Sequence, residues 1–395
     1  MARRRVIFHI DVNSAFLSWT AVKMLREGYQ DIRLVPSVVS GDPEDRRSIV
    51  TAASMPAKRL GIKTAEPVSM ALRKYPDLLI VKGDWEWYGQ CSRGFLDICR
   101  RYSPVLQQFS IDECFIDMTM RNWGEDPVDV ATRLKDEIKS TLGFTVNVGV
   151  GSNKLLAKMA SEFEKTDKVH TLWQEDIEEK MWPLNVRELL WVGKKTEEKL
   201  RRYGIHTIGD LAGISVGSLT RLVGKKFALQ LHDNANGRDD SPVETEIPEA
   251  KSISAERTFP NDIGTEKEID RALFNVACIV AHRLRRAEFH TSCVSVFIKY
   301  RDFSTAQKQH QMSQPTDITA VILNEARKMI SEIWDGRSPI RQIGIGVSRL
   351  THEDAIQMSI FEDPKMDYYR EWDRKYDEKK SSDEDARMLA YERKN

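Results

Sequence analysis

The chain has 395 residues, 60 basic and 60 acidic side chains, and a hydrophobic content of 41%. This length exceeds what one ordinary core covers, so we expect two to four domains. No apolar run approaches the roughly 20 residues needed to cross a bilayer, which argues against a membrane protein. The five cysteines contain no C-x-x-C pair and predict neither a zinc site nor a disulfide framework, as expected in a reducing cytoplasm.

The N-terminal region begins with an apolar run that predicts a strand, Val6–Asp11. Basic residues precede this run, but the run is too short for a signal peptide and leads directly into Asp11. A turn and a helix beginning near Ser14 should follow. Residues 31–82 predict short strands mixed with a helix around Met55–Leu60.

Two acidic residues, Asp112 and Glu113, occupy a second apolar frame, Ser110–Asp117. We expect a helix over 85–101 and then a strand–turn–strand over 105–118 that contains this frame. Burying an unpaired charge costs several kcal/mol, so acids at strand ends usually face a cation. Carboxylate oxygens completed by substrate phosphate form the usual magnesium site. The pattern therefore predicts metal-assisted phosphoryl chemistry.

The next segment continues the alternation of helices and strands. A helix is predicted over Pro127–Leu142 and a strand over Thr145–Val150. Ser152 is a plausible N-cap for the helix after it. This order favours an α+β layer with the acids on one face of its sheet.

Residues 183–240 change in character to short helices separated by glycines. The segment Trp191–Leu211 predicts a helix, a glycine turn and a second helix. Such a hairpin exposes backbone N–H groups at helix starts, which suits binding of DNA phosphates without sequence readout. The alternative is a surface hairpin that binds nothing. The basic side chains beside the hairpin are Lys194, Lys195, Arg201 and Arg202.

The C-terminal part predicts a domain of its own. Residues 241–248 are rich in Pro and Glu and are typical of a linker. The predicted strands and helices after it have the order β-α-β-β-α-β and end near residue 350. The tail then contains two stretches that favour helix, 368–376 and 384–393.

Three sequence frames resemble those of the Y-family DNA polymerases, the DinB/UmuC-type translesion enzymes. They are HIDVNSAF (His9–Phe16), SIDECFID (Ser110–Asp117) and GVGSNKLLAKMAS (Gly149–Ser161), in the same order and spacing. The resemblance covers about residues 5–352. It implies an α+β, multi-domain right-hand polymerase with an antiparallel-sheet palm (1–25 and 82–172), small fingers (26–81), a helix-hairpin-helix thumb (173–240), a linker (241–248), a β-α-β-β-α-β little finger (249–352) and a tail (353–395).

The resemblance also implies roles for individual residues. Asp11, Asp112 and Glu113 would be the catalytic ligands of two Mg²⁺ ions, with the backbone carbonyl of Val12 as a further ligand. Because neighbouring strand residues point to opposite faces, Asp112 and Glu113 can share these ions only if the strand ends or bends there. Further implied residues are the steric gate Phe16, the triphosphate contacts Lys58 and Lys165, and Ser110, which would support the turn or nearby DNA.

Several positions depart from the family pattern. Met55 stands where a tyrosine commonly touches the triphosphate, and Lys58 where arginine is common. Lysine lacks the planar fork that binds phosphate bidentately. None of the departures removes a metal ligand, so they affect the expected nucleotide affinity and lesion preference rather than activity. The remaining departures are Asn13, Ser14, Ala15, the sequence EKTDK around Lys165, and Trp191.

The tail contains QMSIF, which resembles the peptide that docks bacterial polymerases onto the β sliding clamp. Its Gln and apolar side chains suit a shallow hydrophobic pocket; a terminal strand packed on the body is the alternative. The expected partners are therefore primer–template DNA, deoxynucleoside triphosphates and the β clamp, for a monomer in the cytoplasm. The implied clamp contacts are Gln357, Met358, Ile360 and Phe361.

Two other functions compete with a low-fidelity translesion polymerase. A catalytically silent relative that binds DNA and clamp as a scaffold would be expected to lose the acids, and all three are present. A nucleotidyl cyclase could use a similar palm, but it has no need of the domains after residue 183.

Overall fold

The computed structural model describes residues 4–120, 124–246, 248–352 and 365–392, with side chains as far as Lys380. The chain forms two compact units, residues 1–247 and 248–395. Within the described residues, none of the helices combines the length and apolar character that crossing a membrane requires.

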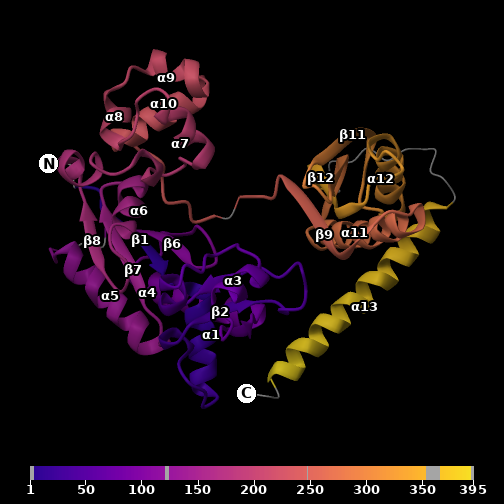
Figure 1. The fold of residues 1–395 in the computed structure, drawn as a ribbon, viewed down its shortest axis with the longest axis horizontal. Helices are drawn as coiled ribbons and strands as arrows, with labels where there is room; N and C mark the ends of the chain where they lie inside the picture. Colours follow the sequence, from indigo (N-terminus) through magenta and orange to yellow (C-terminus); the bar gives the residue numbers. More distant parts are fainter. Residues whose placement is uncertain (1–3, 121–123, 247, 353–364, 393–395) are drawn as a thin grey trace. The chain divides into compact units, whose positions relative to one another are not determined.

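A five-stranded sheet lies at the centre of the first unit, in the order β5-β6-β1-β7-β8 (Figure 1). Neighbouring strands are antiparallel except for β7 and β8, which are parallel. The strands are β1 (Ile7–Val12), β5 (Leu106–Gln108), β6 (Glu113–Asp117), β7 (Val146–Gly151) and β8 (Val169–Leu172).

Alternate residues of β1 point to opposite faces of this sheet. Phe8, Ile10 and Val12 belong to the core formed with α4 and α5, whereas the other face carries Ile7, which packs with Ala157 of α6. His9 and Asp11 share the face of Ile7 and are therefore directed towards the α6 side. The helices around the sheet are α1 (Ala15–Arg26), α4 (Trp85–Tyr102), α5 (Pro127–Leu142) and α6 (Lys154–Glu162).

Helix α6 lies unusually close to β7 because β7 contains Gly149 and Gly151. A Cβ at Gly149 would lie 1.9 Å from the backbone oxygen of Ala157 and 2.4 Å from the backbone nitrogen of Ser161. The helix is capped by Asn153, whose side chain accepts from the backbone N–H of Leu156. The prediction that Ser152 is the N-cap is therefore wrong by one residue.

A smaller three-stranded sheet, in the order β3-β2-β4, has its own apolar core in the first unit. Strands β2 and β4 are parallel, and β3 is antiparallel to β2. The elements of this region are η1 (Ile32–Leu34), β2 (Ser37–Ser40), β3 (Ala52–Ala53), α2 (Met55–Arg59), α3 (Val68–Lys74) and β4 (Leu79–Lys82).

Short helices form the last part of the first unit. Gly204 and Gly224 have positive φ between helices, as expected of glycine turns. Gly209 and Gly217 instead lie inside helices, so the prediction that glycines separate the short helices is wrong at these two positions. The elements are η2 (Gln174–Asp176), η3 (Ile177–Met181), η4 (Val186–Glu188), α7 (Lys194–Arg201), α8 (Ile208–Gly213), α9 (Val216–Val223) and α10 (Lys225–Ala235).

The second unit has the predicted β-α-β-β-α-β order. Its four-stranded antiparallel sheet has the order β11-β10-β12-β9, and α11 and α12 pack against it around one apolar core. The elements are β9 (Ser252–Ile263), α11 (Glu266–Arg286), β10 (Phe289–Tyr300), β11 (Thr305–Thr316), α12 (Thr319–Ile333) and β12 (Ile340–His352).

The tail forms a single helix, α13 (Met366–Glu392), where two separate helical stretches were predicted. It is anchored to the second unit by the buried carboxylate of Asp373, which accepts from the backbone N–H of Thr319 at the start of α12. Arg285 of α11 pairs with Asp373 at 3.2 Å and with Asp377 at 2.6 Å. Asp373 and Asp377 are therefore not merely solvated charges: they attach α13 to α11 and α12.

The close approach of α6 to β7 makes a testable prediction about Gly149. Gly149→Ala should lower the free energy of unfolding by about 3 kcal/mol, the upper range for overpacking, because its Cβ would meet backbone atoms. Urea unfolding followed by tryptophan fluorescence measures this. Gly217→Ala is the matched control, since a Cβ there meets nothing within 4 Å. Equal stability of the two variants would contradict the packing described for α6.

Candidate active site

The two acidic frames meet where β1 pairs with β6. Asp11 lies directly opposite Glu113 in the antiparallel register, so their side chains lie on the same face of the sheet. Strand β6 begins at Glu113, and Asp112 belongs to the bend before it. The backbone N–H of Val12 donates to the carbonyl of Asp112 at 3.0 Å. The regular strand thus begins after Asp112, so the two neighbouring acids do not both lie on regular strand.

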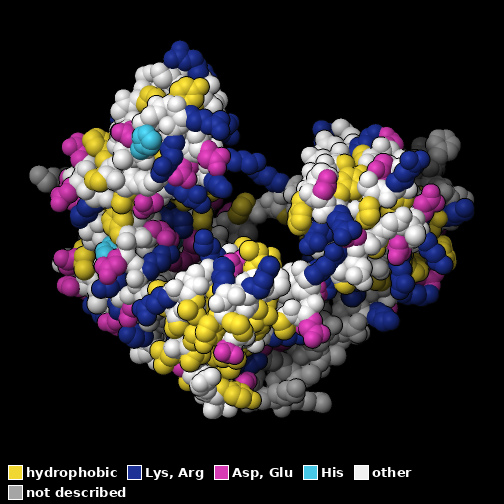
Figure 2. All heavy atoms as spheres, in the orientation of Figure 1, with side chains coloured by type: hydrophobic (Ala, Val, Ile, Leu, Met, Phe, Trp, Pro, Cys, Tyr) yellow, Lys and Arg dark blue, Asp and Glu magenta, His cyan; other side chains and the backbone are white. Residues whose placement is uncertain are grey.

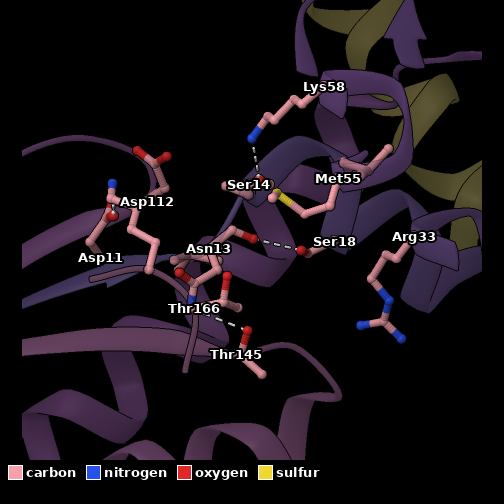
Figure 3. A pocket seen from close by; sticks show the side chains of 14 residues that line it. Asp11, Asn13, Ser14, Ser18, Arg33, Met55, Lys58, Asp112, Thr145 and Thr166 are labelled. Carbon is pink, nitrogen blue, oxygen red and sulfur yellow. Dashed lines mark hydrogen bonds and ion pairs between the residues drawn. The ribbon is translucent and has the colours of Figure 1, made fainter. Parts of the chain in front are cut away.

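A pocket of about 390 Å³ opens beside these acids. Figure 3 shows Asp11 and Asp112 near each other on one side of the pocket, while Lys58 reaches in from α2. The hydroxyl of Ser110 donates to Asp112 at 2.5 Å and accepts from its backbone N–H, which fixes the bend. The pocket is lined by Asp11, Val12, Asn13, Ser14, Ala15, Leu17, Ser18, Arg33, Met55, Lys58, Asp112, Thr145, Lys165 and Thr166.

Lys58 and Lys165 bring positive charge to the same pocket. Lys165 Nζ lies 3.2 Å from Asp11 Oδ2 and 2.7 Å from Glu162 Oε2, and Lys58 Nζ donates to Ser14 Oγ at 3.2 Å. Burial, together with the like charge of Lys165, lowers the pKa of Lys58. The two ammonium groups therefore lie close enough in one pocket to repel each other.

Asp11 is a buried acid whose charge needs a nearby cation. Burial raises the pKa of Asp11 to about 6, although Lys165 acts to lower it. Burial would also lower the pKa of Lys165, but attraction to Asp11 and a hydrogen bond with Glu162 raise it. Lys165 therefore neutralises Asp11 in this structure.

Glu113 has different neighbours and is not among the pocket-lining residues. Its Oε2 lies 2.7 Å from Lys158 Nζ and 3.3 Å from His9 Nε2. Burial acts to raise the pKa of Glu113, but these two hydrogen bonds lower it to about 2. Burial lowers the pKa of His9 to about 4. Glu113 is therefore held as a carboxylate.

The donors at this pocket fit Mg²⁺, which prefers hard oxygen ligands. Asp11 and Asp112 supply carboxylate oxygens to one pocket, and Val12, whose carbonyl was predicted as a ligand, also lines it. Lys165 places a positive charge against Asp11, and a bound metal ion would balance the charge of this acid equally well. Among the described residues no three His, Cys, Asp or Glu side chains converge on one point. Asp11, Asp112 and Glu113 each bond to a different partner: Lys165, Ser110 and Lys158.

Phe16 lies outside the pocket lining and belongs to an aromatic cluster on α1 and α4. Its ring centroid is 5.2 Å from that of Trp85 and 5.1 Å from that of Tyr88. The Tyr88 hydroxyl bonds to Thr20 Oγ1 at 2.6 Å in the buried core. Phe16 is thus partly a core residue, and it is the second residue of α1.

Two departures from the family pattern take specific positions here. Ser14 has φ of 48° at the start of α1, a left-handed conformation uncommon for residues other than glycine, and its hydroxyl contacts Lys58. Met55 lines the pocket and is 52% exposed. A thioether there offers no hydrogen bond of useful strength to a phosphate.

The predicted DNA-binding residues lie on α7. Lys194 and Lys195 form its first turn after Gly193, and no side chain caps its N-terminus. Arg201 pairs with Glu197 at 3.1 Å. Trp191 precedes this turn with φ of 75° and is 56% exposed. Basic side chains are frequent on the visible face of this helical region (Figure 2).

The clamp-binding peptide with Gln357, Met358, Ile360 and Phe361 lies outside the described residues. Sequence reasoning also missed residues that the structure brings to the site. His9 and Lys158 contact Glu113, and Ser161 contacts His9. Arg33 lines the pocket with Thr145. His9, Lys158 and Ser161 all lie inside the sequence frames that resemble the family. Their place in these frames was the signal by which the sequence could have identified them.

Three family models match successive segments of the chain. The impB/mucB/samB family matches residues 10–162, and its C-terminal domain matches residues 250–360. A thumb domain described for DNA polymerase-iota matches residues 188–239.

Similar proteins include two bacterial polymerases. DNA polymerase IV of Clostridium acetobutylicum is 41% identical over 360 residues, covering 91% of this chain and 90% of that protein. DNA polymerase IV 1 of Bacillus subtilis is 34% identical over 362 residues, covering 91% and 86%.

A solved Y-family DNA polymerase chimera superposes with a TM-score of 0.76 at 20% identity, covering 88% of this chain and 100% of that one. At this identity the superposition shows the fold only, which is that of a multi-domain right-hand polymerase. The family assignment comes from the matched family models and the more similar relatives. The chain belongs to the impB/mucB/samB family, the Y-family of DNA polymerases.

Proposed function

We propose that this chain is a template-directed DNA polymerase that extends a primer 3′-hydroxyl with deoxynucleotides and acts at low fidelity in translesion synthesis. The supporting observation is the pocket in which Asp11 and Asp112 face Lys58 and Lys165. Acids for a metal ion and ammonium groups for a polyphosphate, both in one pocket, suit nucleotidyl transfer. Family relatives named DNA polymerase IV support the same activity.

Each residue has a distinct part in this proposal. Asp11, Asp112, Glu113 and the carbonyl of Val12 would hold two Mg²⁺ ions, which when bound supply Lewis acidity and neutralise phosphate charge. Lys58 and Lys165 orient the triphosphate. Most of the catalysis then comes from alignment and from fixed charges rather than from covalent steps on the protein.

The DNA would be held by its phosphates. Lys194 and Lys195 at the start of α7, with Arg201 at its end, contact the DNA backbone, and no side chain caps the N-terminus of this helix. Such contacts carry no sequence information and suit an enzyme that must accept any template. The domain boundaries predicted above place these residues in the thumb.

The remaining proposals concern partners and place of action. The peptide with Gln357 and Phe361 would bind the β sliding clamp, a proposal that rests on sequence alone. The enzyme would work as a monomer in the cytoplasm, where its DNA substrate lies. All five cysteines are free and buried, in keeping with a reducing environment.

Asp112→Ala tests the polymerase proposal. Primer extension should fall by about a thousandfold, because several kcal/mol of transition-state stabilisation are removed, while the affinity for primer–template DNA stays within about twofold. Single-turnover extension and fluorescence anisotropy measure the two quantities. Substantial residual extension would remove Asp112 from the site and leave the silent scaffold as the better reading.

Phe16→Ala tests the steric gate. Ribonucleotide incorporation should rise relative to deoxynucleotide incorporation, because the ring that clashes with a 2′-hydroxyl is gone. The ratio of kcat/KM values for the two nucleotides measures it. Since Phe16 also packs on Trp85 and Tyr88, the thermal midpoint is measured in parallel. A lower midpoint with unchanged discrimination would make Phe16 a core residue only.

Salt dependence tests the predicted DNA contacts. Replacing Lys194 and Lys195 together by Ala should reduce the slope of log K against log salt concentration by about 2, one for each lost phosphate contact. Lys375→Ala on α13, an exposed lysine already paired with Glu371, is the matched control and should keep the slope. An unchanged slope in the double variant would place the DNA elsewhere.

A further inference from the structure

Glu113 is held by only one of its two carboxylate oxygens. Lys158 Nζ at 2.7 Å and His9 Nε2 at 3.3 Å both contact Oε2. Within the described part of the chain, no hydrogen bond reaches Oε1. The carboxylate is therefore fixed in orientation while one oxygen remains open to a ligand.

The His9 ring is itself fixed on both sides. A carboxylate only accepts hydrogen bonds, so Nε2 must carry the hydrogen that it shares with Glu113. On the other side of the ring, Nδ1 lies 2.8 Å from the hydroxyl of Ser161. Phe115 stacks on the ring with centroids 4.7 Å apart. The same hydroxyl also lies 2.7 Å from the carbonyl oxygen of Lys158, so Ser161 ties the ring to α6 and, together with Phe115, helps to direct the Nε2 hydrogen to Glu113.

Helix α6 supplies two of these three groups. Lys158 and Ser161 are one turn apart and share a face of the helix. The close approach that Gly149 permits brings this face against β1. His9 is fully buried, and the Lys158 side chain is 12% exposed, so water competes little with these bonds. His9, Lys158 and Ser161 are not among the residues that line the pocket with Lys58 and Lys165.

We propose that Ser161, His9 and Lys158 are positioning residues that hold Glu113 by Oε2, so that Oε1 is the oxygen offered to a divalent cation. This inference rests on the polymerase function proposed above and extends it to three residues outside the acid set. Groups that orient a metal ligand from behind commonly change metal affinity or activity by 10- to 100-fold when removed.

The positive charge of Lys158 should also affect cation binding, which a purely structural residue would not do. Its ammonium group neutralises Glu113, and a cation on Oε1 would meet a like charge across the same carboxylate. Removing that ammonium group should therefore tighten cation binding, although the loosened carboxylate lowers turnover. Affinity and rate are expected to change in opposite directions.

The first experiment separates turnover from nucleotide binding in the full-length protein. Ser161→Ala should lower kcat for primer extension about tenfold and leave KM for the deoxynucleotide within about twofold, because the nucleotide pocket is untouched. Ser103→Ala removes a similarly buried hydroxyl, bonded to the Asp117 carbonyl at the far end of β6, and should leave both unchanged. Normal kcat in Ser161→Ala, or equal loss in Ser103→Ala, would overturn the proposal.

The second experiment does not depend on activity. Binding of Mn²⁺ to the protein is followed by the loss of its free electron paramagnetic resonance signal. Lys158→Met should bind Mn²⁺ about tenfold more tightly, while Lys158→Arg, which keeps the charge, should resemble the parent. In a Glu113→Gln background the Lys158→Met change should have no effect. An effect that persists in that background, or no effect at all, would overturn the proposal.

The two failures can be told apart. If the parent protein extends no primer, the polymerase function fails, and the Mn²⁺ titrations still report whether Lys158 acts on Glu113. If extension is normal but the Lys158 and Ser161 variants behave as the parent, only the positioning proposal fails. Circular dichroism of each variant confirms that the fold is retained before either conclusion is drawn.

Discussion

The antiparallel register of β1 and β6 is the constraint on which the active site depends. It places Asp11 opposite Glu113, and it directs Phe8, Ile10 and Val12 into the core formed with α4 and α5. A slip by one residue would exchange these two sets of side chains between the faces of the sheet. The apolar core therefore fixes the positions of the acids, and the geometry of the candidate site is a consequence of how the sheet packs.

Burying acids at that point requires cations, and α6, on the same face of the sheet as the acids, and the segment after it supply them. Lys158 of α6 pairs with Glu113, and Lys165, just after the same helix, pairs with Asp11. Gly149 lets α6 approach closely enough for the first of these contacts. The glycine in β7, the helix and the acid on β6 thus act as one unit, although they are far apart in the sequence.

Much of this arrangement could be predicted from the sequence. Acids inside apolar frames are rare, so Asp11, Asp112 and Glu113 were distinguishable without a structure, and the β-α-β-β-α-β order followed from periodicity. The contacts of Lys158 could not be predicted, because a lysine on an amphipathic helix is normally solvated. The same holds for Asp373, which looks like one charge among many in the tail but is buried at the start of α12. Such roles depend on tertiary packing, which the local sequence pattern does not reveal.

The charges of the site suggest how it would accept its substrates. In this structure the buried acids are neutralised by lysines of the protein itself, so the acids do not stand as uncompensated charges. A magnesium-bound triphosphate carries both signs of charge: Asp11 would hold a metal ion that balances its charge, and the Lys165 ammonium group would then contact phosphate oxygens. Binding would therefore exchange ion pairs rather than create them from separately hydrated charges. Lys158 differs because it lies outside the pocket lining, so it would remain on Glu113 throughout.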